Sequence, residues 1–455
     1  MRALPSGGTV MKILVVGGGA REHAICKAVV KGGGELYSVM KNLNPGIARL
    51  SKTYKFMDEK NVAEVVAWAQ EQGIEMLVVG PEASLEVGIV DAFNKAGIAA
   101  ASPTKAAARI ETDKAFMRDL MLRHDVPGRV EYHTFTDVAE MEAFVRSYPG
   151  RLVVKPIGLT GGKGVRIEGE QMANKEEVVA YAREVIEEGI GGSTAVVIEE
   201  CVEGEEFTLQ CFSDGNTIKT MPPVQDHKRA YEGDVGPNTG GMGSYSAADH
   251  LLPFLPARVM EQAKVICQAV IDALRRDGSP YVGTMYGQFM YTPRGPMVIE
   301  FNARFGDPEA MNVLPLLKTS YVEVLKAMVE GTLGAMELEF APKATVCKYI
   351  VPKGYGVSSL VDVPLGVNLE VVSNSGAIMF YASVNERDGK IFTTSSRSVA
   401  FVGCGTTIAE AEAKAEAALS SVTGEYDARH DIGKPATIER KINHMREVLE
   451  SHQND

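Results

Sequence analysis

The sequence has few cysteines, no long apolar run and no excess of basic residues. Its six cysteines lie far apart without a Cys-x-x-Cys pair, which argues against a thiolate metal site and fits free thiols in a reducing cytosol. Because no run approaches about 18 apolar residues, we expect no membrane span. The net charge of −12 disfavours general binding of nucleic acid, so an anionic substrate requires a local cationic pocket.

The first ten residues lack the apolar core of a secretory signal, and we expect residues 1–10 to be a loose extension before Met11. A chain of 455 residues predicts about three domains. Glycine is abundant, at 46 residues, and is concentrated in a few loops. These loops are the first candidates for binding sites.

The N-terminal third alternates between buried strands and amphipathic helices. Strands are predicted at 13–16, 76–79 and 98–101, and helices at 61–72 and 85–95. This βαβα order predicts a parallel sheet with helices on both faces.

The rest of the chain mixes strands with a few long helices. The predicted strands are 152–156, 165–167, 195–200, 207–212, 281–291 and 297–301, and the predicted helices are 256–276, 321–329 and 408–419. Asp214-Gly215-Asn216 predicts a hairpin turn, and the chain after Pro342 is β-rich up to Val402.

The first glycine loop, Gly17–His23, follows a buried strand and precedes a helix, a position that suits an anion. It does not match the dinucleotide fingerprint, because Glu22 occupies the third glycine position and no acidic residue lies between Leu36 and Met57. Arg21 and His23 instead indicate a phosphate monoester. A plain tight turn is the alternative.

The second glycine loop follows the strand that ends at Lys155 and Pro156. Four glycines within 158–164 can bring backbone N–H groups close to phosphate oxygens. It is not a Walker A loop, since Gly164 follows Lys163 where Ser or Thr is required. A lysine at the end of an apolar strand needs an anionic partner. The pattern predicts nucleotide phosphate binding, with a surface hairpin as the alternative.

Two further segments carry weaker signals. The connector after the strand 196–200 can present backbone groups to an adenine edge and a carboxylate to ribose, although acidic clusters are also common in solvated turns. The segment Glu232–Ser246 contains five glycines and follows the polar run Gln225–Arg229. It is interpreted as a mobile active-site cover or a disordered linker.

The strand Met297–Asn302 carries the most mechanistic pattern. Alternation places Met297, Ile299 and Phe301 on one face and Val298, Glu300 and Asn302 on the other. Two oxygen ligands on one face can bind Mg²⁺, and a three-residue loop at 293–295 would set Gln288 opposite Glu300. A solvent-facing polar strand is the alternative.

Five motifs in combination resemble the phosphoribosylamine–glycine ligases, or glycinamide ribonucleotide synthetases, which are ATP-grasp enzymes. The motifs are Gly17–His23, Gly80–Glu82, Gln225–Arg229, Gly236–Gly243 and Arg304–Glu309. The resemblance extends from about Lys12 to Arg446.

The resemblance implies a multidomain α/β architecture. A Rossmann-like, biotin-carboxylase-like parallel-sheet domain is expected at 1–112, and a two-part ATP-grasp α+β domain at 113–342, with a lid subdomain at about 123–195. A β-rich C-terminal domain that ends in a helix is expected at 343–455.

The resemblance also implies an activity. ATP would drive the ligation of glycine to 5-phospho-D-ribosylamine, which gives N1-(5-phospho-D-ribosyl)glycinamide, ADP and phosphate through glycyl phosphate, in de novo purine biosynthesis. Mg²⁺ or Mn²⁺ is the expected cofactor, with ATP as co-substrate. We expect a cytoplasmic monomer or weak dimer that acts on small molecules and binds neither nucleic acid nor membrane.

Site residues are carried over from the family position by position. The ATP-binding residues would be Lys114, Lys155, Gly161, Gly162, Lys163, Glu199, Cys201, Val202 and Glu206, with Glu205 as the alternative ribose ligand. Phosphoribosylamine would contact Gly18, Gly19, Arg21, Glu22, Gly80, Pro81 and Glu82, and Glu300 and Asn302 would bind the metal. Catalysis would rest on Arg304, Asp226 and Lys155, of which Arg304 and Asp226 orient glycine.

Three segments depart from the family pattern: Pro156–Thr160, Asn42–Gly46 and Ser395-Ser396. Other functions stay open at this stage. They are another ATP-grasp carboxylate–amine ligase, a nicotinamide-dependent oxidoreductase built on the first glycine loop, and a non-catalytic nucleotide sensor.

Overall fold

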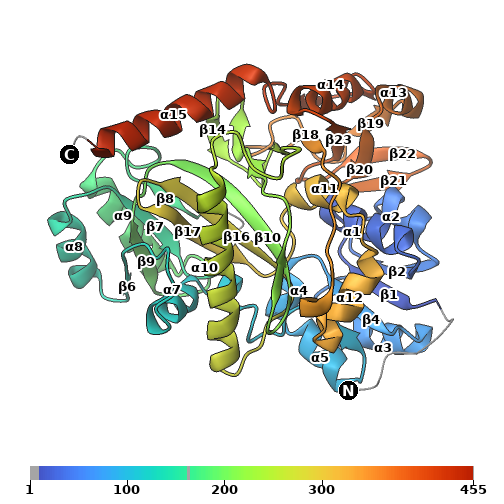
Figure 1. Cartoon of the computed structure of the whole chain (residues 1–455), viewed down its shortest axis with the longest axis horizontal. Helices are drawn as coiled ribbons and strands as arrows, with labels where there is room; N and C mark the ends of the chain where they lie inside the picture. Colours follow the sequence, from blue (N-terminus) through green and yellow to red (C-terminus); the bar gives the residue numbers. More distant parts are fainter. Residues whose placement is uncertain (1–9, 161–163, 454–455) are drawn as a thin grey trace.

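The computed structural model describes residues 10–160 and 164–453, and its N-terminal part is a parallel sheet (Figure 1). The strands pair in the order β3-β2-β1-β4-β5. They are β1 (Lys12–Val16), β2 (Glu35–Met40), β3 (Thr53–Phe56), β4 (Met76–Val79) and β5 (Ala99–Ala100). Strands buried on both faces favour apolar residues, which explains the apolar run Ile13–Val16 of β1 and the apolar sequence of β4.

Seven helices belong to this part of the described chain. They are α1 (Ala20–Lys31), α2 (Pro45–Leu50), α3 (Val62–Gln72), α4 (Glu82–Glu86), α5 (Ile89–Lys95), α6 (Arg109–Thr112) and α7 (Lys114–Arg123). The single helix predicted for 85–95 is wrong. Gly88 has φ +81°, a left-handed conformation that separates α4 from α5.

Two antiparallel sheets form the middle of the molecule. The first has the order β6-β9-β7-β8 and the second β11-β10-β16-β17. Their strands are β6 (Tyr132–Phe135), β7 (Leu152–Pro156), β8 (Arg166–Ile167), β9 (Val196–Glu200), β10 (Glu205–Asp214), β11 (Ile218–Thr220), β16 (Val282–Thr292) and β17 (Gly295–Asn302). The predicted hairpin turn at 214–216 is confirmed, with Gly215 at φ +90° between β10 and β11.

Helices pack on these two sheets. α8 (Val138–Ser147) and α9 (Lys175–Glu188) share a separate hydrophobic core with β7 and β9. α10 (Ala257–Arg276) packs along the second sheet, because its buried residues recur every three or four positions and form one apolar face. Pro256 precedes its first turn, as the sequence predicts.

A third sheet joins strands from both sides of Pro342. Its order is β12-β15-β18-β23-β20, and β25 also pairs with β18. The strands are β12 (Gln225–Asp226), β15 (Gly243–Ser246), β18 (Ala344–Pro352), β20 (Ile378–Tyr381), β23 (Val399–Gly405) and β25 (Tyr426–Ala428). Strands from both sides of the boundary predicted after residue 342 therefore share one sheet.

The alternative interpretation of Glu232–Ser246 as a disordered linker is wrong, and its interpretation as a mobile active-site cover stays a prediction. β14 (Val235–Asn238) pairs with β13 (Arg229–Tyr231), and β15 lies between β12 and β18. The glycines allow close strand contact: a Cβ on Gly243 would lie 2.3 Å from the carbonyl oxygen of Cys347.

The C-terminal part adds a small sheet and several helices. The sheet has the order β21-β22-β19-β24, with β19 (Pro364–Val367), β21 (Val384–Arg387), β22 (Lys390–Thr393) and β24 (Val422–Thr423). The helices are α11 (Glu309–Val313), α12 (Tyr321–Glu330), α13 (Leu369–Ser375), α14 (Ile408–Leu419) and α15 (Pro435–Gln453), and two 3₁₀ turns lie at Leu314–Leu316 and Leu333–Ala335.

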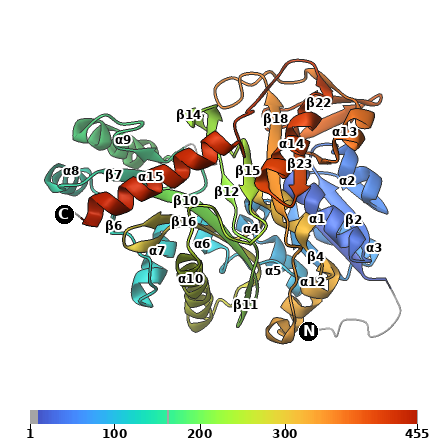
Figure 2. The ribbon, with the colours of Figure 1, turned by 45° about the horizontal axis from the view of Figure 1, so that its top comes forward.

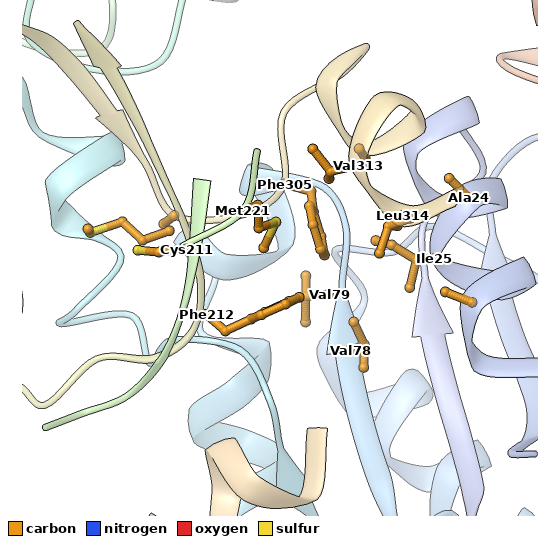
Figure 3. Close-up of a cluster of buried hydrophobic side chains, with 14 of the residues drawn as sticks. Ala24, Ile25, Val78, Val79, Cys211, Phe212, Met221, Phe305, Val313 and Leu314 are labelled. Carbon is orange, nitrogen blue, oxygen red and sulfur yellow. The ribbon is translucent and has the colours of Figure 1, made fainter. Parts of the chain in front are cut away.

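One hydrophobic core connects the N-terminal sheet with the second antiparallel sheet and with β18 and β23. Figure 3 shows Phe212 of β10 and Phe305 between this sheet and Val79 of β4. Their rings meet edge-on with centroids 6.0 Å apart. This shared core fixes the N-terminal glycine loop relative to the strands that carry the other motifs.

We expect Gly403→Ala in β23 to destabilise the protein by about 3 kcal/mol. A Cβ there would lie 1.8 Å from the carbonyl oxygen of Ala411, so β23 and α14 would have to separate. The measurement is the free energy of unfolding in guanidinium chloride. The control is Gly278→Ala, which has φ +75° and open space around it and should cost only about 1 kcal/mol. Equal stabilities for the Gly403 variant and the wild type would contradict the packing described here.

Candidate active site

A buried cluster of three charges lies where α7, β7 and β9 meet. Nζ of Lys155 lies 2.6 Å from Oε2 of Glu199, and Arg118 donates to both carboxylate oxygens at 2.6 and 2.8 Å. Burial alone would raise the pKa of Glu199, but Arg118 and Lys155 lower it below its usual value. Glu199 is thus the anionic partner that Lys155 was predicted to need, and its carboxylate is fully engaged.

Arg118 was not found by sequence reasoning. Its guanidinium also donates to the carbonyl oxygens of Val298 and Ile299, both at 2.9 Å, and Lys155 donates to Ile299 at 3.0 Å. The available signal was the spacing of four residues from Lys114, which places both cations on one face of α7. Through Glu199, Arg118 therefore links Lys155 of β7 to β17, the strand that carries the candidate metal ligands.

Strand β17 contains a bulge that changes which side chains share a face. Thr292 pairs with Gly295 across a two-residue turn, Phe289 pairs with Val298, and Gln288 pairs with Glu300. The predicted pairing of Gln288 with Glu300 is confirmed, but the predicted three-residue loop is wrong. Because the bulge adds a residue at position 299, Val298 lies on the apolar side rather than beside Glu300.

Glu300 and Asn302 share the polar face of this sheet with Gln288, beyond the bulge. Burial would raise the pKa of Glu300, but Lys228, Lys155 and Lys114 lower it. Oε1 of Gln288 is buried and has no hydrogen-bond partner among the described residues, while its Nε2 donates to Glu206. A carboxylate, an amide oxygen and an unsatisfied amide oxygen on one face fit a hard divalent cation. Elsewhere in the described chain, His, Cys, Asp and Glu form no group of three that could hold a metal.

The other predicted nucleotide residues lie around this face. Lys114 begins α7 and donates to the carbonyl oxygen of Gly158 at 2.9 Å, which brings it beside the second glycine loop. Burial lowers the pKa of both Lys114 and Lys155. Gly161, Gly162 and Lys163 lie outside the described residues.

Two adjacent carboxylates, Glu205 and Glu206, begin β10 after the connector that follows β9 and point to opposite sides of the strand. Glu206 faces the polar side and contacts Lys228 at 3.3 Å, whereas Glu205 is bound by α15 on the other side. Cys201 uses its own N–H in a bond to the carbonyl oxygen of Arg151 at 2.9 Å. Val202, next to it, is half-buried.

On the N-terminal side, Arg304 connects the strand motif to the parallel sheet. Its guanidinium lies 2.8 Å from Glu111 and 3.3 Å from Glu82, which begins α4 after Pro81. Burial would raise the pKa of Glu82, but Arg304 and Arg21 lower it to about 2. For Glu111, burial dominates and raises the pKa to about 7. Glu111 is a second site residue that sequence reasoning missed.

The first glycine loop is filled by a side chain from its own helix. Glu22 accepts a hydrogen bond from the N–H of Gly19 at 2.7 Å and lies 2.6 Å from Nε of Arg21. A Cβ on Gly80 would lie 2.0 Å from its carboxylate, which is a physical reason for glycine there. Gly18 is bound through its carbonyl oxygen by Asn42 and Asn44.

His23 does not face the loop as a charged group. Its Nδ1 accepts a hydrogen bond from the N–H of Tyr381 at 3.0 Å, and its ring packs against Phe380 and Tyr381 of β20. Burial, with Lys27 nearby, lowers the pKa of His23 to about 3. A neutral imidazole supplies no positive charge to the phosphate monoester that the sequence pattern of Arg21 and His23 indicates.

Asp226 and the segment after Arg304 complete the polar face. Burial and Glu206 raise the pKa of Asp226, while Lys228 opposes the shift. Arg397, also missed in the sequence, lies 3.2 Å from Asp307 and donates to the carbonyl oxygen of Gly240 at 2.7 Å. Motifs far apart in the chain therefore meet, because Arg397 comes from the C-terminal part.

Three family models match the chain in order. The N domain of phosphoribosylglycinamide synthetase matches residues 11–111, its ATP-grasp (A) domain 112–310 and its C domain 345–435. The chain belongs to the phosphoribosylglycinamide synthetase family. This finding sets aside the reading of the first glycine loop as a nicotinamide site.

Relatives in this synthetase family match over nearly their whole length. "Phosphoribosylamine--glycine ligase" of Methanoregula boonei is 52% identical over 439 residues, which cover 96% of this chain and 100% of that protein. The protein of the same name from Methanothermobacter thermautotrophicus is 50% identical over 438 residues, with the same coverage.

Solved structures agree with the fold. The crystal structure of phosphoribosylamine–glycine ligase from Thermotoga maritima has a TM-score of 0.79 at 25% identity and covers 92% of this chain and 100% of its own. The biotin carboxylase domain of a 2-oxoglutarate carboxylase from Hydrogenobacter thermophilus has a TM-score of 0.71 at 16% identity and covers 97% of this chain and 94% of its own. The expected biotin-carboxylase-like arrangement of the synthetase family is confirmed. Among the described residues, no helix is both long enough and apolar enough to span a membrane.

Glu59 lies near the first glycine loop and allows a test of its electrostatics. Burial raises the pKa of this carboxyl to about 7, with Lys41 opposing and Glu22 adding to the shift. Between about pH 4.5 and 7 the folded protein holds a proton that the unfolded chain releases, so wild-type stability falls as pH rises through this window.

We therefore expect Glu59→Gln to be more stable than the wild type at about pH 8, where the wild type must bury the charged form. At about pH 4.5 the two proteins should differ little. The measurement is the unfolding free energy at each pH, with Glu64→Gln on the exposed side of α3 as the control. A difference between Glu59→Gln and the wild type that does not change with pH would refute the shift.

Proposed function

We propose that this chain joins glycine to 5-phospho-D-ribosylamine at the expense of ATP in purine biosynthesis. The products are N1-(5-phospho-D-ribosyl)glycinamide, ADP and phosphate, which makes the chain a carbon–nitrogen ligase. The carrying observation is the position of Arg304, which lies between the polar face of Glu300 and Asn302 and the N-terminal loop end at Glu82. One arginine thus joins the nucleotide side to the second-substrate side.

The nucleotide is proposed to bind across the two antiparallel sheets. Lys114, Lys155 and Lys163 would contact its phosphates, together with Gly161 and Gly162. Glu199, Cys201 and Val202 would border the adenine and Glu206 the ribose, an assignment supported by the engagement of Glu205 with α15. The geometry supports Lys155 in this role, because Glu199 and Arg118 hold it rigidly.

A divalent cation, Mg²⁺ or Mn²⁺, is proposed to be held by Glu300, Asn302 and Gln288. When bound, it would offset negative charge on the phosphates of ATP. Glu300 supplies a single negative charge, so the cation keeps a net positive charge for the nucleotide. Asn302 and Gln288 supply neutral oxygens, and the Gln288 amide is oriented by its bond to Glu206.

Phosphoribosylamine is proposed to bind at the N-terminal loops. Its contacts would be Gly18, Gly19, Arg21, Glu22, Gly80, Pro81 and Glu82, and Asp226 and Arg304 would orient glycine. Arg21 is the buried cation of this group, and it also donates to the carbonyl oxygen of Phe305 at 3.4 Å. Arg21 would supply the local positive charge that a phosphate needs in a chain of net charge −12.

The proposed chemistry has two displacements. A carboxylate oxygen of glycine bonds to the γ-phosphorus of ATP. At the same time the bond between the γ-phosphorus and the β–γ bridging oxygen breaks, and ADP is released. The amine nitrogen of phosphoribosylamine then bonds to the acyl carbon, phosphate leaves with the acyl oxygen, and the nitrogen loses a proton. The side chains position and neutralise the reactants, and no covalent intermediate with the chain is involved.

The substrate requirement gives the direct test of this function. We expect ADP and phosphate to form only when glycine, phosphoribosylamine and Mg-ATP are all present, because the amine displaces phosphate from an intermediate that otherwise stays bound. The measurement is phosphate release with each component omitted in turn, with mass spectrometry of the amide product. Sustained turnover without phosphoribosylamine would overturn the proposal.

Removing the Glu300 charge tests the metal site. We expect Glu300→Gln to lower kcat by roughly 100-fold or more, because the amide keeps the shape but not the charge that holds the cation. The thermal midpoint should change little, as Glu300 lies on a polar face and is not a core residue. Glu330→Gln, at the exposed end of α12, is the control. Near-normal turnover of Glu300→Gln at low Mg²⁺ would exclude this site, and a variant that fails to fold would make Glu300 structural.

We also propose a cytoplasmic location and a monomeric or weakly dimeric state. They add nothing to the chemistry of the site, which lies within one chain.

A further inference from the structure

Helix α15 lies beyond the part of the chain that the family models match. The C-domain match ends at residue 435, and α15 occupies Pro435–Gln453. The helix runs from the C-terminal part across the molecule toward the sheet of β7 and β9 (Figures 1 and 2). Its side chains at three- and four-residue spacing pack into the main core: Ile438, Ile442, Met445, Val448 and Leu449. α15 is therefore docked through a continuous apolar face.

Polar side chains beside this apolar face bind two acidic residues outside the helix. Nζ of Lys441 lies 3.4 Å from Glu205 and 3.1 Å from Asp234. Nδ1 of His444 lies 2.7 Å from Glu205, and Arg440 donates to Asp234 at 3.1 Å. Glu205 is buried, and a buried carboxylate is costly without a counter-charge. Lys441 of α15 supplies a counter-charge to Glu205, and His444 of the same helix contacts its carboxylate.

The contacts of α15 with Glu205 act on the polar face because Glu205 lies at the start of β10, next to Glu206. Glu205 and Glu206 are adjacent in this strand, so their side chains point to opposite faces. Nε2 of Gln225 donates to the carboxylate of Glu205 at 3.3 Å and to the carbonyl oxygen of Glu206 at 3.1 Å. The hydroxyl of Tyr245 donates to Oε1 of Gln225 at 2.6 Å. Fixing Glu205 therefore fixes the strand end that presents Glu206.

The contacts of α15 with Asp234 connect the helix to the motif Gln225–Arg229, because Asp234 also binds His227. Asp234 has φ +58°, a left-handed conformation that costs free energy and is held by its charged neighbours. One of its oxygens lies 3.1 Å from Nδ1 of His227 and 2.9 Å from Arg429. The other ring nitrogen of His227 is buried without a hydrogen-bond partner in the described part of the chain. α15 thus contacts Glu205, and it also contacts Asp234, which binds His227 next to Lys228, the residue that contacts Glu206.

We propose that α15 is a positioning element for the nucleotide, in which Lys441 and His444 hold Glu205 so that Glu206 is oriented for the ribose. This inference rests on the proposed function in assigning the ribose to Glu206. Lys441 and His444 lie on the opposite side of the strand from the nucleotide and act as positioning residues. Their loss should weaken nucleotide binding more than it slows the chemical step, because Lys155, Glu300 and Arg304 do not depend on α15.

The experiment compares ADP binding in the full-length protein by isothermal titration calorimetry with Mg²⁺ present. Lys441→Met keeps the aliphatic stem and removes the charge, and it should raise the Kd for ADP roughly tenfold, as is typical of coupling between two sites. His444→Gln should raise it in the same direction. Lys441→Arg should restore wild-type affinity. In turnover, the KM for ATP should rise with the Kd while kcat stays within about twofold.

Arg446→Met is the matched control. Arg446 is exposed on the same helix and contacts only its helix neighbour Asn443, at 3.2 Å, among the contacts described for it. The variant removes the same charge and should leave the Kd for ADP unchanged. An equal rise in Arg446→Met would assign the effect to net charge and overturn the inference.

Unchanged ADP affinity in folded Lys441→Met and His444→Gln would also overturn it. If Lys441→Met does not fold, His444→Gln decides, because His444 is half-exposed and its loss leaves the apolar face intact. A fall in kcat with unchanged Kd and KM would contradict a role in nucleotide positioning. Wild-type protein that binds ADP but makes no glycinamide product would refute the proposed function and leave this comparison intact.

Discussion

The buried ion cluster of Arg118, Glu199 and Lys155 is the interaction on which the candidate active site depends. It joins α7 to β7 and β9, and its bonds to the carbonyl oxygens of Val298 and Ile299 extend it to β17. Removing one partner of such a cluster would leave a buried charge uncompensated, at a cost of roughly 3–5 kcal/mol. This cluster sets the distance between Lys155, proposed to bind the nucleotide, and the face proposed to bind the metal.

A second constraint is the sharing of Arg304 between two carboxylates with opposite pKa shifts. Glu82 stays ionised because two arginines outweigh its burial, whereas burial dominates at Glu111. Arg304 therefore contacts one ionised carboxylate, Glu82 at the N-terminal loop, and a second carboxyl group, Glu111, whose pKa is about 7. Asp307 and Arg397 extend this charge pattern to the C-terminal part, so all three parts of the chain are needed to assemble the proposed site.

Sequence periodicity predicted most elements, and its failures have local causes. The pairing of Gln288 with Glu300 was predicted with a three-residue loop, but the structure reaches it through a two-residue turn and a bulge at residue 299. The turn is one residue shorter than predicted, and the bulge adds one residue, so Glu300 has its predicted partner. Val298 lies between the turn and the bulge, so its pairing is shifted by one residue and its side chain lies on the other face. The predicted helix 85–95 is divided by the left-handed conformation of Gly88, which the spacing of apolar residues does not reveal. Arg118 carries only its four-residue spacing from Lys114, and Arg397 lies outside the motifs, because the partners of both residues lie far away in the chain.

The sequence by itself determined the family and the parallel N-terminal sheet, and it supplied most of the candidate site residues, because glycine loops and charged strand ends are local patterns. Only the tertiary structure decided how charges are paired. His23 is neutral against Tyr381, Glu205 is bound by α15 while Glu206 stays on the polar face, and Glu199 holds Lys155. The physical reason is that burial and distance set the state of an ionisable group, and both arise from segments brought together by folding.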